Sequence, residues 1–146
     1  MTQRLDYYKA APDAVKAMLG VETYLKGAMD KTLMHLVKVR ASQINGCAFC
    51  LDMHWRDARK DGLTEQQLYS LDTWREATVY SDRERAAIAW TEALTLVATT
   101  HAPDAEFEAA RAVFNDKELA DLSWAIAAIN AWNRIAIGFR VPPKGG

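Results

Sequence analysis

Cysteine is scarce in this chain of 146 residues, and its only two cysteines lie close together, at positions 47 and 50. So few cysteines do not form the disulfide framework that stabilises small secreted domains. Two neighbouring cysteines in a chain without an export signal favour catalysis, redox exchange or metal binding over a structural cross-link.

Signals for export or membrane insertion are also missing. Residues 1–6 lack the apolar core of a signal peptide. The longest uncharged run near the C-terminus, residues 122–133, is too short to span a bilayer, and Arg134 ends it. We therefore expect a cytoplasmic protein that does not enter the membrane.

An excess of charge of one sign is absent. The chain has 18 Lys and Arg against 19 Asp and Glu, a formal net charge of -1, and no segment is strongly basic. This balance argues against nucleic acid and anionic membranes as partners. Half of the residues are hydrophobic and a quarter are charged, which is typical of a globular protein. The length predicts one domain over residues 1–146 with a sizeable core.

No segment shows the sustained alternation of a β-strand, whereas apolar residues recur every three or four positions in seven segments. The sequence therefore predicts an all-α, single-domain bundle of about seven helices, with a lead-in over residues 1–10, a loop at 99–102 and a tail at 141–146. Asp30 and Asn115 are suited to cap helices, and Thr64 and Ser81 open capping boxes. The predicted helices are 11–27, 30–45, 47–59, 64–71, 81–97, 103–114 and 115–137.

Polar residues within these segments carry further expectations. Glu22 falls on the mostly apolar stripe of the first helix. Arg40 lies on the apolar stripe of the second helix and needs an acidic partner if it is buried, whereas His35 lies off that stripe. The last helix is apolar nearly all round, so it should be central or covered by another subunit.

The two cysteines and a following histidine form a motif at the expected start of a helix. Cys47 and Cys50 are three positions apart, so they share a helix face with Cα atoms roughly 5–6 Å apart, a separation that a disulfide tolerates. The free N–H groups and the dipole of the helix N-terminus lower the pKa of a thiol there below about 8.5. Gly46 is suited to the left-handed end of the preceding helix.

The same motif assigns unequal roles to the cysteines. His54 follows Cys50 by one turn, whereas Cys47 is roughly 10 Å from it along the axis. The helix dipole favours Cys47 as the thiolate, and the histidine favours Cys50. Because a base within reach also moves protons during turnover, we assign Cys50 as the attacking thiol. Cys50 attacks a peroxide to give a sulfenic acid, Cys47 condenses with it to a disulfide, and an external dithiol reduces the pair.

The segment from Leu36 to His54 carries an R-x-x-Q-x-N-G-C-x-x-C-x-x-x-H pattern. It resembles the alkylhydroperoxidase D family, which belongs to the carboxymuconolactone decarboxylase-like superfamily. The resemblance implies an all-helical fold, a homo-oligomer (a trimer or hexamer), and peroxidase activity through thiols without a metal or haem cofactor. It also implies that Cys50 attacks the hydroperoxide, that Cys47 resolves the sulfenic acid and that His54 relays protons. We expect an external dithiol or lipoyl-type reductant.

Two positions depart from that family. Well-studied members have a glutamate twelve positions before the first cysteine, where this chain has His35. Some members have a histidine between the cysteines, where this chain has Phe49. A histidine titrates near neutral pH, so His35 is a candidate for the proton relay. Decarboxylases of the superfamily generally lack the cysteine pair, which argues against that activity here.

Other interpretations of the motif remain open. The disulfide could act as a switch in a redox-responsive binding or stress protein without fast turnover. Cys47, Cys50 and His54 could hold structural zinc with His35, His101 or a carboxylate as fourth ligand. The cysteines could also be two small buried residues without chemistry. Phe49 and Met53 favour an organic peroxide if the first interpretation holds.

Overall fold

The computed structural model describes residues 2–144, and every regular element in that range is helical. The all-α prediction is confirmed. Met1, at the start of the predicted lead-in, and Gly145 and Gly146, at the end of the predicted tail, lie outside the described residues. The elements are α1 (Tyr7–Ala10), α2 (Pro12–Ala28), α3 (Lys31–Asn45), α4 (Ala48–Lys60), α5 (Glu65–Tyr69), η1 (Leu71–Thr73), α6 (Asp82–Thr95), α7 (Val97–Thr100), α8 (Asp104–Arg111) and α9 (Asp116–Gly138).

The predicted capping residues start the helices as expected. The side chain of Asp30 accepts the N–H of Leu33, and Thr64 and Ser81 form complete capping boxes. Asn115 and Glu118 cap α9 in the same way. These caps work because the first backbone N–H groups of a helix have no partner within it.

Two short α-helices were not predicted. Helix α1 lies in the segment expected to be a lead-in, and α7 overlaps the expected loop at residues 99–102. Each has four residues, which is too short for a helical repeat of apolar residues to be visible in the sequence. Asp6 caps α1 by accepting the N–H of Lys9 at 3.3 Å.

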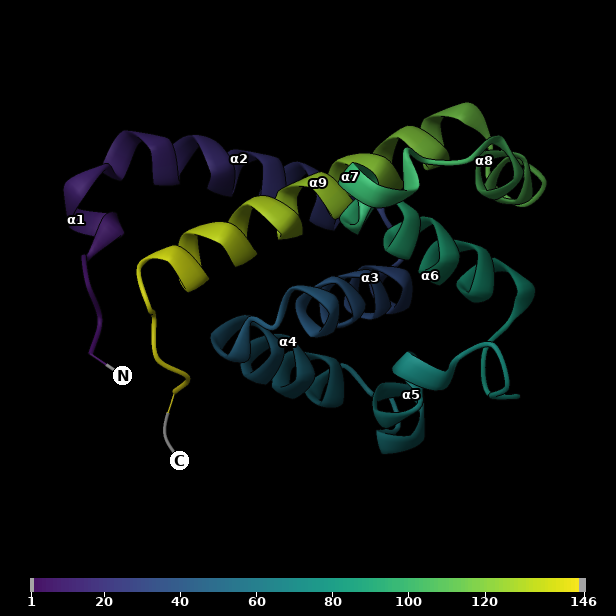
Figure 1. Cartoon of the computed structure of the whole chain (residues 1–146), viewed down its shortest axis with the longest axis horizontal. Helices are drawn as coiled ribbons and strands as arrows, with labels where there is room; N and C mark the ends of the chain where they lie inside the picture. Colours follow the sequence, from purple (N-terminus) through teal and green to yellow (C-terminus); the bar gives the residue numbers. More distant parts are fainter. Residues whose placement is uncertain (1, 145–146) are drawn as a thin grey trace.

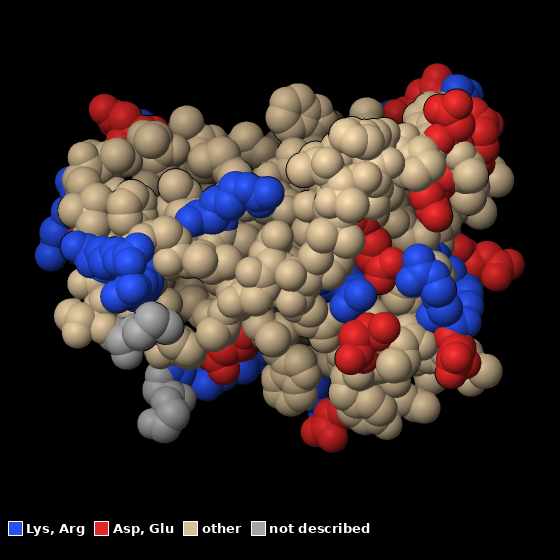
Figure 2. All heavy atoms as spheres, in the orientation of Figure 1, with Lys and Arg blue, Asp and Glu red and all other residues tan. Residues whose placement is uncertain are grey.

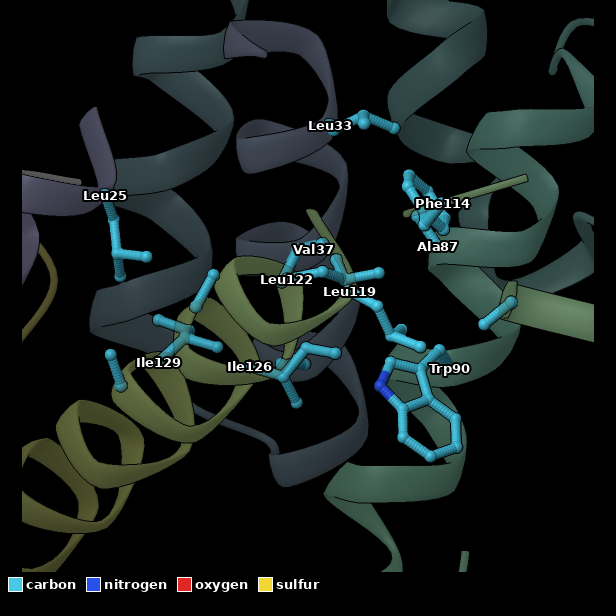
Figure 3. Packing of buried hydrophobic residues seen from close by; sticks show 14 of the residues in the cluster. Leu25, Leu33, Val37, Ala87, Trp90, Phe114, Leu119, Leu122, Ile126 and Ile129 are labelled. Carbon is cyan, nitrogen blue, oxygen red and sulfur yellow. The ribbon is translucent and has the colours of Figure 1, made fainter. Parts of the chain in front are cut away.

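Helix α3 is the central element of the molecule. It packs against α4, α6 and α9, while α9 also runs beside α2 (Figure 1). Figure 3 shows α9 side chains interleaved with those of α2, α3 and α6. On another side of α3, Leu36 and Val39 pack into a second cluster with residues of α5, η1 and α6. Because α3 is buried on several sides, its C-terminal end is held firmly where the cysteine motif begins.

Polar contacts fix the same end of α3 against α9. The amide of Asn45 donates to the side-chain oxygens of Asn130 and Asn133, at 2.9 Å each. Asn133 is fully buried and donates to the Ser42 hydroxyl at 3.1 Å. Buried amides need such partners, so this network sets how α9 lies over the residues just before Gly46 and Cys47.

The expected acidic partner of Arg40 is Glu92 of α6. The guanidinium approaches the carboxylate to 2.8 Å, and both side chains are nearly buried. Trp74 and Arg75 also donate to Glu92. Burial alone would raise the pKa of Glu92, but these donors lower it below its usual value.

Within residues 2–144, no helix combines the length and apolar character that crossing a membrane requires.

Candidate active site at the cysteine pair

Cys47 and Cys50 form a disulfide at the junction of α3 and α4, with Cα atoms 5.3 Å apart. Gly46 has a left-handed backbone (φ 69°), which lets α3 end and the chain turn at once into α4. Cys47 is the N-cap of α4 rather than its first residue, and its sulfur accepts the N–H of Cys50 at 3.3 Å. The pair therefore lies at a helix N-terminus, as the sequence predicted.

The two cysteines face different cavities. Cys50 lines a cavity of about 260 Å³ together with His54. Cys47 lines a second cavity, of about 430 Å³, which His54 does not border. Phe49 and Ala136 line both and lie between them. The cysteines themselves are 1% and 2% exposed, so a reagent must enter a cavity to reach either sulfur.

The cavity beside Cys50, called the Cys50 cavity below, is mostly apolar. Its walls come from α1, α2, α3, α4 and α9. The apolar and aromatic residues are Tyr7, Tyr8, Leu19, Phe49, Met53, Trp132 and Ala136. Tyr7 of α1 packs against Phe139 and Trp132, with ring centroids 6.2 and 6.5 Å away. Burial, and next Tyr8, raise the pKa of Tyr7 to about 12, so its phenol is neutral at physiological pH.

His54 is half-buried in the wall of this cavity. Burial lowers the pKa of its imidazole to about 3, with smaller contributions from the positive charge of Lys38 and from His35. An imidazole with this pKa is neutral at pH 7. The neutral imidazole keeps a lone pair that can accept a hydrogen bond from a thiol, but a pKa this low makes it a weak base, so it takes the thiol proton only as the sulfur reacts.

A largely buried ion pair in the same cavity was missed at the sequence level. Lys38 of α3 donates to Glu22 of α2 at 2.5 Å, and Trp132 of α9 donates to the other carboxylate oxygen at 3.1 Å. The side chains of Lys38 and Glu22 are 14% and 20% exposed. The available signal was a glutamate on an otherwise apolar helix stripe, because such a residue needs a buried partner.

His35 does not line the Cys50 cavity. It borders an adjacent cavity of about 690 Å³, whose lining it shares with His54, Lys38 and Glu22. The expectation that His35 lies off the buried face is wrong, since the residue is 8% exposed. Its Nε2 lies 2.7 Å from Asp61, just beyond α4, and its Nδ1 is buried without a hydrogen-bond partner. The contact with α4 buries this side of α3, which the periodicity of α3 alone could not reveal.

The structure does not support the interpretation that the motif binds zinc. Within the described range, no group of three or more His, Cys, Asp or Glu side chains is arranged to hold a metal ion. Cys47, Cys50 and His54 do not converge with His35 or His101 on one point.

Comparison with known proteins gives a consistent result. The model of the carboxymuconolactone decarboxylase family matches residues 9–93. The chain is 44% identical over 138 residues to the uncharacterized protein YdfG of Bacillus subtilis (strain 168), and the match covers 94% of each chain.

Solved structures extend the match to nearly the whole chain. One is a protein of unknown function from Agrobacterium tumefaciens, suggested to be an antioxidant defence protein AhpD. It has a TM-score of 0.95 and 46% identity, with 99% of this chain and 100% of that chain covered. The debrominase Bmp8 has a TM-score of 0.82 over 94% of this chain and 74% of its own. At 15% identity, the likeness to Bmp8 concerns the fold alone.

Proposed function

The chain belongs to the carboxymuconolactone decarboxylase family and is alkylhydroperoxidase D-like, and from this premise we propose that it reduces hydroperoxides through its two cysteines. The observation that carries the proposal is the shared cavity of Cys50 and His54. A thiol and a neutral base lie on successive turns of α4 and border one apolar space. Cys47 is already within disulfide distance.

The cycle starts from the reduced pair. His54 takes up the thiol proton of Cys50 as the sulfur attacks one oxygen of the hydroperoxide. The O–O bond breaks, the alcohol leaves with the proton from His54, and Cys50 becomes a sulfenic acid. The Cys47 thiol then attacks the Cys50 sulfur, water leaves and the disulfide forms. An external dithiol restores both thiols and is itself oxidised to a disulfide.

Groups around His54 support these steps. The ammonium of Lys38 also faces this cavity, where the carboxylate of Glu22 largely offsets its charge. His35 and Asp61 border the neighbouring cavity, which His54 also borders. We assign His35 to proton exchange between His54 and solvent, as a positioning and relay residue that does not touch the peroxide.

The lining of the Cys50 cavity defines the substrate class. Its volume of about 260 Å³ and its aromatic and aliphatic walls favour a small organic hydroperoxide over hydrogen peroxide alone. Glu22 and Lys38 neutralise each other, so the cavity does not select a strongly charged substrate.

The first prediction tests the cysteine roles. Reduced Cys50→Ser should consume no organic hydroperoxide, because the attacking thiol is gone. Reduced Cys47→Ser should consume one equivalent and stop, because the sulfenic acid has no resolving thiol. Consumption of cumene hydroperoxide is measured with a lipoyl-type dithiol as donor. If the wild-type protein consumes no organic hydroperoxide with any dithiol, the proposal is wrong.

One observation favours a second candidate function, a redox switch. The disulfide packs against Ala136 of α9 and Val141, just after that helix. Opening it could loosen this end of α9 and alter partner binding without multiple turnovers. Sizing of oxidised and reduced samples tests this candidate, which fails if the two elute identically and bind the same partners.

A further inference from the structure

We propose that the cavity beside Cys47 is a separate site for the reductant, and that it takes a small dithiol that carries a carboxylate. This inference rests on the proposed function, because it assigns the second half of that cycle. Peroxide and reductant would then approach the disulfide from opposite sides. The cavity beside Cys47 is called the Cys47 cavity below.

The charges around the two cavities differ. In the Cys50 cavity the cation Lys38 is paired with Glu22. The Cys47 cavity is lined by two arginines, Arg4 and Arg140, and among the described residues no Asp or Glu lines it. Figure 2 shows Lys and Arg side chains gathered at the end of the molecule where both chain termini lie. An anionic group entering this cavity meets two guanidinium groups and, within residues 2–144, no carboxylate in the cavity lining.

Both arginines are held at the cavity by the end of α9. Arg4 donates its backbone N–H to Phe139 at 2.9 Å and its guanidinium to the carbonyl of Gly138 at 3.2 Å. Ala48, Val141 and the prolines 142 and 143 complete an apolar wall. A short hydrocarbon chain with a carboxylate at one end and thiols at the other matches this distribution.

Arg140 occupies a backbone conformation that usually requires glycine. It follows the C-cap of α9 with φ 53°. The N–H of Val141 donates to the carbonyl of Ala136 at 2.9 Å, and that of Arg140 to Ile137 at 3.1 Å, which is the Schellman arrangement. Left-handed geometry is unfavourable for a residue with a side chain and often occurs at functional sites. Arginine thus occupies a position where glycine would be more stable.

The chemistry follows from which sulfur each cavity exposes. A reductant thiolate in the Cys47 cavity attacks the Cys47 sulfur, and the bond to Cys50 breaks. Cys50 leaves as a thiolate beside Lys38 and His54, where it takes up a proton from solvent. The second thiol of the reductant then loses its proton and attacks the reductant's first sulfur, the one bonded to Cys47 in the mixed disulfide. Cys47 is released and protonated, and the reductant becomes a cyclic disulfide.

The second prediction tests the charge preference by single-turnover reduction of the oxidised protein, without peroxide. Dihydrolipoate and dihydrolipoamide carry the same dithiol and differ in the carboxylate. The acid should reduce the wild type about tenfold faster than Arg140→Glu, whereas the amide should reduce both within about twofold. Lys16→Glu makes the same change of charge at an exposed residue that lines none of the three cavities described, so it should behave as the wild type. Reduction is measured by acid quench, alkylation and protein mass.

Arg140→Gly is a second variant that removes the charge, and it keeps the test valid if Arg140→Glu misfolds. It should raise the melting temperature, because glycine suits the left-handed position, yet it should slow reduction by the acid. An acid-to-amide rate ratio that is the same in all variants would overturn the proposal. No peroxide enters this assay, so its failure is distinguishable from failure of the peroxidase assay.

The site of attack has its own measurement. The oxidised protein is treated with excess mercaptoacetate, quenched with iodoacetamide and mapped by mass spectrometry. The proposal requires mercaptoacetate on Cys47 and the alkyl group on Cys50. The reverse labelling would place the reductant in the Cys50 cavity and overturn the proposal.

Discussion

At the scale of single residues, His54 combines burial with a charge environment that keeps it neutral. Its pKa in the folded protein is about 3, below the ordinary value of 6.5. Between these values the unfolded chain binds a proton that the folded chain does not bind. Stability from this group is therefore complete above pH 6.5 and is lost as pH falls through this window, by on the order of 2 kcal/mol between pH 7 and 5.

The third prediction uses this linkage. Urea unfolding of the oxidised protein at pH 7 and pH 5 should show a loss of stability at the lower pH. His54→Gln, which cannot titrate, should lose less by on the order of 2 kcal/mol. Equal losses in the two proteins would contradict a neutral, half-buried His54 in the folded state.

Site contacts between residues near in sequence were predicted, whereas site contacts between residues that only the fold brings together were not. Cys47 caps α4, and Cys50 and His54 lie on it, so spacing alone placed the disulfide and the following base on adjacent turns. Lys38, Glu22 and Trp132 come from three helices, and no local pattern connects them. The burial of His35 depends on Asp61, which is 26 positions away.

At the scale of elements, helix ends were predicted better than helix contacts. Ends depend on capping residues within a few positions, as at Asp30 and Ser81. Helix α1 is an example of a helix whose contacts were not predicted. It lines the Cys50 cavity because Tyr7 packs against Trp132 of α9. Only the tertiary structure shows that contact.

The fourth prediction concerns the junction of α3 with α9. Asn45→Ala and Asn133→Ala should each destabilise the protein by about 1–3 kcal/mol, because the first leaves the buried Asn133 oxygen without its donor and the second leaves the buried Ser42 hydroxyl without its donor. Their effects should couple by on the order of 1 kcal/mol, since the two side chains share a hydrogen bond. Chemical unfolding of the single and double variants measures this coupling. Effects that add within about 0.3 kcal/mol would show that the contact does not join the helices.

At the scale of the whole molecule, α9 has apolar side chains that are exposed to solvent as well as those that it buries in the core. One face packs into the core, while Trp124, Ile135 and Ile137 on other faces are 63%, 38% and 44% exposed. Leu96 and Val97, at the start of α7, are about half exposed as well. Figure 2 shows a largely uncharged surface over α9 with few Lys or Arg side chains. We propose that a second copy of the chain covers this face, in keeping with the expected homo-oligomer.

The fifth prediction tests that arrangement. Trp124→Glu places a charge in the middle of the proposed contact and should lower the molar mass in solution, because an unpaired charge is costly to bury. Size-exclusion chromatography with light scattering measures the mass over a range of concentrations. Tyr69→Glu is the matched control, since Tyr69 is 67% exposed but lies on α5, and it should leave the mass unchanged. A monomeric wild type, or an equal fall in both variants, would place any contact elsewhere.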